Sequence, residues 1–153
     1  QTLRDLGFPS FVILRPVFVM ENLLSPMFLN GDTLVTALDP ETSLQMVAVK
    51  DIGKVGARAF THAEEMNGSE IDFAGDAVTM QAAAKVVSSI LGRPITYSRI
   101  PIEAVRENSE DFALMLEWFD KVGYDVDIEG VASRFGVPMT RLTDWARDHA
   151  AQA

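Results

Sequence analysis

The feature that most constrains this chain is a continuous apolar run, Phe11 to Leu14, that meets Arg15 and Pro16. An apolar run without polar alternation is typical of a strand buried on both faces of a parallel sheet. Proline has no amide hydrogen, so strand pairing is predicted to stop there. In open α/β sheets, the loops after the carboxyl ends of the strands line the ligand crevice. The loop from Val17 to Asn22 is therefore the best candidate for a pocket.

Helix and strand signals alternate along the rest of the chain. Gly7 is the predicted end of a helix that occupies the first residues, and Thr79 and Gly92 are the predicted cap and stop of another. Further strands are predicted over 34–37, 45–49, 70–73 and 95–98. From Pro101 the pattern becomes helical, with breaks near Asn108, Gly123 and Gly136. Residues 1–153 are thus predicted to form one α/β unit with a helical C-terminal cap.

Composition excludes several classes of partner. The formal net charge is -9 with an isoelectric point near 4.6, so the field of the protein repels phosphate backbones and anionic membrane surfaces. No apolar run approaches the ~18 residues of a membrane span. There is no cysteine, which excludes disulfides and thiolate nucleophiles and fits a cytoplasmic protein. We expect no direct contact with nucleic acid and none with a membrane.

The residues by themselves identify no catalytic group. Asp51 follows an apolar run at the start of a predicted helix, where a capping aspartate belongs. Tyr97 and Tyr124 would be activated as proton donors by a lysine four residues later, but Pro101 and Ile128 stand there. The catalytic residue therefore stays unassigned.

A metal site is not expected either. Residues 125–130, DVDIEG, copy the opening of a calcium loop, but the twelfth position is Gly136, which cannot supply the bidentate carboxylate. The same acids are expected to be solvated or to cap the following helix. His62 and His149, the only histidines, belong to no metal-binding pattern.

Each candidate pocket residue also has a purely structural explanation. Arg15 would pair with a carboxylate, Phe18 and Met20 would fill the core, and Asn22 would cap a helix. On the helix predicted after Asp111, an apolar stripe is either core or a wall of a substrate pocket; it comprises Phe112, Leu114, Met115, Leu116, Trp118 and Phe119. Both interpretations stay open on the residues alone.

Several motifs in order carry a resemblance to a known family. They are FVILRPVFVMEN (11–22), LDPETSLQMVAVKDIG (38–53), FAGDAVTMQAAAKVV with LGRPI (73–95), and EWFDKVGYDVDI (117–128). Together they resemble the C-terminal half of NmrA-like proteins, which are atypical short-chain dehydrogenases/reductases. The likeness covers nearly the whole chain. It implies the C-terminal part of a Rossmann-like parallel sheet with a helical cap on the substrate side.

The resemblance also implies a site and a function. The residues expected beside the nicotinamide of NAD(P) are Pro16, Val17, Phe18 and Asn22. The residues expected to form the substrate pocket are Met20, Met27, Met46 and Trp118. The complete protein is then expected to be an NAD(P)H-dependent oxidoreductase acting on a quinone or similar carbonyl-like substrate. The alternatives are an NAD(P)-sensing regulator that binds a protein partner, and an inactive fragment.

The chain departs from the family pattern in one respect. It starts at Gln1 and contains no G-x-x-G-x-x-G loop, which members of the family use to bind the dinucleotide pyrophosphate. We therefore expect the N-terminal glycine-rich half to be absent and NAD(P), with NADPH as the expected form, to require it. The sheet edge left open would favour a homo-oligomer or a protein partner.

Overall fold

The computed structural model describes residues 2–150. The helices are α1 (Thr2–Asp5), the 3₁₀ helix η1 (Met20–Leu24), α2 (Val49–Thr61), α3 (Met80–Leu91), α4 (Ile102–Arg106), α5 (Glu110–Lys121), α6 (Ile128–Phe135) and α7 (Leu142–Ala150). The strands are β1 (Ile13–Pro16), β2 (Phe18–Val19), β3 (Leu29–Asn30), β4 (Thr33–Thr36), β5 (Ser43–Val47), β6 (Glu70–Phe73), β7 (Asp76–Thr79) and β8 (Thr96–Arg99).

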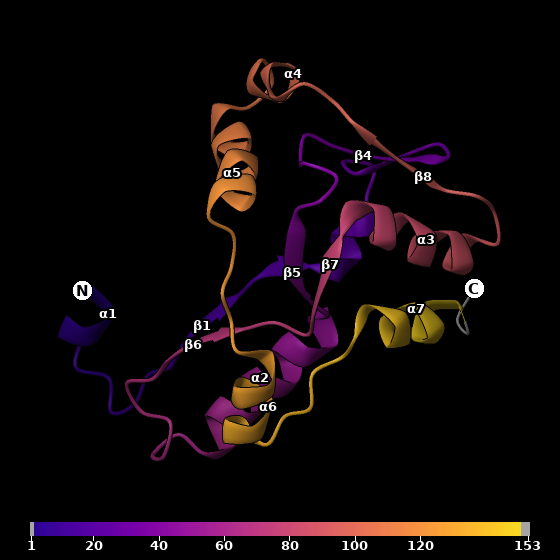
Figure 1. Cartoon of the computed structure of the whole chain (residues 1–153). Helices are drawn as coiled ribbons and strands as arrows, with labels where there is room; N and C mark the ends of the chain where they lie inside the picture. The colour runs from indigo at the N-terminus through magenta and orange to yellow at the C-terminus, as the bar shows by residue number, and fades with distance from the viewer. Residues whose placement is uncertain (1, 151–153) are drawn as a thin grey trace.

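The strands form an α/β arrangement with parallel and mixed pairing. Parallel pairs join β1 to β6, β2 to β5 and β4 to β8, while β3–β4 and β5–β7 are antiparallel. In Figure 1, β5 and β7 lie between the α4–α5 pair on one side and α2 with α6 on the other. The predicted α/β class with a Rossmann-like parallel component is confirmed.

The first strand differs from its prediction. It begins at Ile13 and continues through Arg15 and Pro16, and its residues are half-buried or exposed, not buried on both faces. The groove between β1 and α2 leaves part of one face of the strand open, and among residues 2–150 β1 has a partner on one edge only, which is β6. Pro16 is compatible with a strand because its missing amide hydrogen faces the unpaired edge, away from β6.

This open edge continues into an apolar groove between β1 and α2. The groove has a volume of about 390 Å³ and is lined by Phe8, Ser10, Phe11, Val12, Leu14, Gly56, Ala59, Phe60 and Ala63. Phe60 is 89% exposed and Phe8 is 56% exposed. Large exposed apolar side chains beside an unpaired strand edge are unusual on the solvent-exposed surface of a protein. They indicate a site where another segment packs.

Most of the predicted boundaries are confirmed. The Thr79 hydroxyl accepts a hydrogen bond from the Ala82 amide at the start of α3, and Gly92 ends that helix with φ of 63°. The breaks near Asn108, Gly123 and Gly136 separate α4, α5, α6 and the segment before α7. Asp127, in the calcium-like segment, caps α6 by accepting a hydrogen bond from the Gly130 amide. Three short strands, β2, β3 and β7, were not predicted.

The prediction that Asp51 caps α2 is wrong. The cap residue of α2 is Ala48, and the first amide, that of Val49, is bound by the Glu21 carboxylate at 3.1 Å. Asp51 lies in the first turn and is fully buried. Its carboxylate accepts hydrogen bonds from the Thr140 amide at 2.6 Å and the Thr140 hydroxyl at 3.1 Å. It therefore fastens the segment before α7 to α2.

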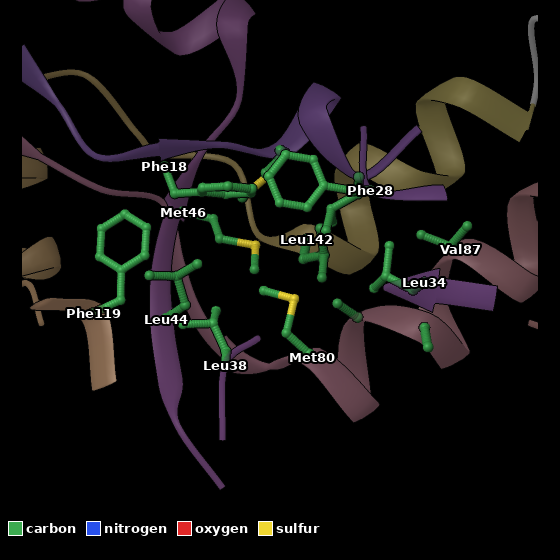
Figure 2. Packing of buried hydrophobic residues seen from close by; sticks show 14 of the residues in the cluster. Phe18, Phe28, Leu34, Leu38, Leu44, Met46, Met80, Val87, Phe119 and Leu142 are labelled. Carbon is green, nitrogen blue, oxygen red and sulfur yellow. The ribbon is translucent and has the colours of Figure 1, made fainter. Parts of the chain in front are cut away.

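The core contains two clusters of buried side chains. The larger one surrounds Met46 and Met80, which have no exposed surface, and includes Phe18, Phe28 and Leu142. Figure 2 shows these side chains converging from β2, the loop before β3, β5, α3 and α7. Packing of this kind fixes β2 and η1 in place, and so positions the loop that the sequence singles out.

Candidate functional site

The loop after β1 forms one wall of a large apolar cavity, which we call the head cavity. Its volume is about 670 Å³, within the range of small-molecule sites. It is lined by Val17, Phe18, Val19, Asn22, Ser25, Pro26, Met27, Phe28, Phe112, Met115, Phe119 and Tyr124. These residues come from the link between β1 and β2, from β2, η1, the loop before β3, α5 and the loop after α5.

Aromatic contacts hold the two walls together. The Phe18 ring packs edge-on against Phe28, with ring centroids 5.3 Å apart, and against Phe119 at 6.4 Å. Phe28 in turn contacts Phe112 at 6.0 Å. Edge-to-face pairs at these separations add favourable quadrupole interactions to the apolar burial. The cavity therefore has a wall made from two segments about 90 residues apart.

Three polar side chains interrupt this apolar lining: Asn22, Ser25 and Tyr124. For the Asn22 amide and the two hydroxyls, no hydrogen-bond partner is found among residues 2–150. Tyr124 packs against Trp118 at 5.2 Å and against Phe119 at 5.3 Å between ring centroids. Burial raises the pKa of Tyr124, so its phenol stays protonated and able to donate near neutral pH.

The structure brings together four of the eight predicted site residues. Val17, Phe18 and Asn22 from the predicted cofactor set and Met27 from the predicted substrate set all line the head cavity. Met27 is 69% exposed at its rim.

The other four predicted site residues lie elsewhere. Pro16 is exposed at the end of β1 and is not part of the cavity wall. Met20 and Met46 have no exposed surface and belong to the core, because β2, η1 and β5 turn these side chains inward. Trp118 is 41% exposed and contacts Tyr124 outside the lining.

Sequence reasoning left the opposite wall undecided. Phe112, Met115 and Phe119 of the apolar stripe line the cavity, and Phe119 is at the same time buried in the core together with Leu116. For Tyr124, the sequence was used only to ask whether a lysine four residues later could activate the phenol. It did not indicate that Tyr124 lines a pocket. The packing of α5 against Phe18 and Phe28 brings these residues to the cavity that Asn22 also lines, and no local pattern in the sequence predicts that packing.

Arg15 pairs with carboxylates, as its structural explanation in the sequence analysis expected. Its guanidinium donates two hydrogen bonds to Asp72, each of 2.8 Å, and one to Glu70 at 2.6 Å. The hydrogen bond from Arg15 lowers the pKa of Asp72. Arg4 first, and then Arg15, lower the pKa of Glu70. Arg15 thus stabilises the β1–β6 pair and is engaged away from the head cavity.

The helix N-termini bear on where a phosphate group could bind. A free helix N-terminus is a ready anion site. In α3, α5 and α6 the first turn is capped by the side chains of Thr79, Ser109 and Asp127. The first amides of α2 and α7 are bound by Glu21 and Asp76. Within residues 2–150, the N-termini of all the helices of eight residues or more are thus engaged by the chain's own side chains.

The carboxylates and histidines do not gather into a metal site. No group of three or more histidine, cysteine or carboxylate side chains capable of holding a metal ion occurs among residues 2–150. In that part of the chain no helix combines the length and the apolar character needed to cross a membrane.

Comparison with known proteins identifies the family. The sequence profile of the NmrA-like family matches residues 1–147, almost the whole chain. The chain belongs to the NmrA-like family. Direct sequence comparison with curated proteins finds no match.

Solved structures show the same fold. An NADPH-dependent quinone oxidoreductase from Escherichia coli superposes with a TM-score of 0.71 at 23% identity, over 95% of this chain and 57% of that one. The transcriptional regulator NmrA in complex with NADP gives 0.66 at 17% identity, covering 98% and 55%. A triphenylmethane reductase from Citrobacter gives 0.67 at 13% identity, covering 97% and 55%. This NmrA-like chain therefore spans little more than half the length of these relatives.

Proposed function

We propose that this NmrA-like chain is the substrate-side half of a cytoplasmic NAD(P)H-dependent oxidoreductase that reduces a quinone or a similar small carbonyl compound. The observation that carries the proposal is the head cavity. It is uncharged, aromatic on two sides, and offers the side chains of Asn22, Ser25 and Tyr124 as hydrogen-bonding groups. A flat, neutral substrate with an acceptor oxygen matches these properties better than a charged one.

The cofactor would use only part of this chain. Val17, Phe18 and Asn22 fit the nicotinamide end, since they combine apolar contact with an amide able to bond a carboxamide. The pyrophosphate finds no free helix N-terminus in residues 2–150, so we assign it to residues upstream of Gln1. The groove between β1 and α2 supports a division of the cofactor site between this chain and upstream residues, because a parallel strand from those residues would cover the open edge of β1. When bound, the cofactor supplies the hydride.

The test is turnover and cofactor binding by the full-length protein. NADPH oxidation should be observed with small benzoquinones and naphthoquinones, and NADPH should bind in the micromolar range. The 153-residue chain alone should bind NADPH at least a hundredfold more weakly, because it lacks the phosphate cradle. A full-length protein that oxidises no NADPH over a broad quinone panel would contradict the enzymatic proposal.

Tyr124→Phe tests the polar side of the head cavity. Phenylalanine keeps the ring contacts with Trp118 and Phe119 but removes the hydroxyl. We expect the dissociation constant for a quinone to rise about tenfold, since one hydrogen bond to the bound oxygen is lost. Fluorescence titration of both proteins measures this. The matched control is Tyr97→Phe: that hydroxyl is bonded to Thr36 and the Leu38 carbonyl outside the head cavity, so quinone affinity should not change.

A second candidate function is NAD(P) sensing without turnover. It is favoured by the absence of any carboxylate, histidine or lysine from the head-cavity lining, which leaves Tyr124 as its only titratable side chain. Micromolar cofactor binding with no turnover, together with a protein partner whose binding depends on the ratio of oxidised to reduced cofactor, would support this role over the enzymatic one.

A further inference from the structure

A second apolar cavity lies beside the head cavity, and we call it the tail cavity. Its volume is about 390 Å³, and it is lined by Met27, Ile100, Ala104, Val105, Asn108, Ser109 and Phe112. These residues belong to α4, to the segments before and after it, to α5 and to the loop before β3.

The two cavities adjoin each other at two side chains. Met27 and Phe112 line both of them, so these two side chains form the boundary between the spaces. Met27 is unbranched and 69% exposed, and an exposed methionine changes rotamer at little cost. Movement of the Met27 side chain is the change that would let a ligand in the head cavity extend into the tail cavity.

The chemistry of the two linings differs. In the head cavity, the polar side chains have no hydrogen-bond partner among residues 2–150. In the tail cavity, the Asn108 amide already donates to the Ala104 carbonyl at 2.9 Å. The Ser109 hydroxyl already accepts from the Phe112 amide at 3.3 Å. Most of the tail-cavity lining is hydrocarbon and none of its side chains is charged, which suits an aliphatic group better than a charged one.

We infer that the substrate carries an unsaturated or saturated hydrocarbon tail, and that this tail binds in the tail cavity while the flat head occupies the head cavity. The inference rests on the proposed function, because it extends the same quinone-like substrate. It narrows the substrate class to prenylated or alkylated quinones, as opposed to tail-free ones. Ala104, at the tail-cavity wall and exposed on α4, becomes a specificity-determining residue.

The experiment is a series of quinones with the same head and zero, one or two prenyl units. Their dissociation constants are measured on the full-length protein with bound cofactor, by quenching of tryptophan fluorescence; Trp118 contacts Tyr124 of the head cavity and reports binding there. A fully buried methylene strengthens binding roughly fourfold, so a partly enclosed five-carbon prenyl unit is expected to strengthen it about tenfold.

Two variants locate the effect. Ala104→Phe places a ring in the tail cavity and should abolish the gain from each prenyl unit. Ala57→Phe is the matched control, because Ala57 is an exposed residue of α2 that lines neither cavity, and it should keep the gain. Circular dichroism of both variants establishes that each is folded.

The outcomes separate the two proposals. Equal affinities for tail-free and prenylated quinones, or a gain that survives in Ala104→Phe, would overturn the tail subsite while quinone binding itself stands. Failure of every quinone to bind would overturn the proposed substrate class, and the tail subsite with it.

Discussion

Replacement of Asp51 by asparagine is expected to lower the free energy of unfolding by about 3 kcal/mol. The buried carboxylate accepts hydrogen bonds from the Thr140 amide through one oxygen, and from the Thr140 hydroxyl and Lys54 through the other. An asparagine has one oxygen, so in either orientation its NH₂ group faces a donor. The cost combines lost charge-assisted hydrogen bonds with an unsatisfied buried amide. Urea denaturation of both proteins measures it.

The control for this change is Asp111→Asn. Asp111 is exposed in the first turn of α5, where its carboxylate contributes only through the helix dipole. The expected loss is below about 1 kcal/mol. Equal losses in the two variants would show that the contact between Asp51 and Thr140 contributes little, and that the segment before α7 is held by its apolar side chains.

Replacement of Gly75 by alanine is expected to destabilise the same region by about 3 kcal/mol. A Cβ at this position would lie 2.3 Å from the Thr140 carbonyl oxygen, a backbone atom that cannot rotate away. The Gly75 amide is itself fixed by a 2.7 Å hydrogen bond to the Met46 carbonyl. Relief of the clash requires displacement of the segment around Thr140 from β7, and overpacking of this kind is costly.

The matched control is Gly53→Ala. Gly53 lies within α2, and a Cβ added there would meet no side chain within 4 Å. Alanine there should raise the free energy of unfolding by about 0.5–1 kcal/mol, because it lowers the entropy of the unfolded chain and favours helix. Hydrogen exchange adds a local readout: in Gly75→Ala, amides of residues 137–146 should lose protection before those of α3. Uniform protection in both glycine variants would contradict the steric argument.

Predictions that depend on interactions between residues close in sequence agree with the structure, and those that depend on distant residues agree less well. The α3 helix was predicted with its cap and stop because Thr79 and Gly92 act on amides and carbonyls within one turn of themselves. The first strand was predicted too buried because burial depends on neighbouring strands. An apolar run indicates that a strand packs inside a sheet. It does not indicate whether the segments that cover that strand lie within residues 2–150.

The chain's own residue order determined the α/β class, most of the helix boundaries and the family resemblance, since each depends on local patterns or on motifs in order. Tertiary packing alone decided the rest. It turned Met20 and Met46 into the core, brought Tyr124 and α5 to the cavity that Asn22 lines, and made Asp51 a partner of Thr140. The physical reason is that a side chain's direction and its contacts with residues about 90 positions away are set by how helices and strands pack, which no window of neighbouring residues encodes.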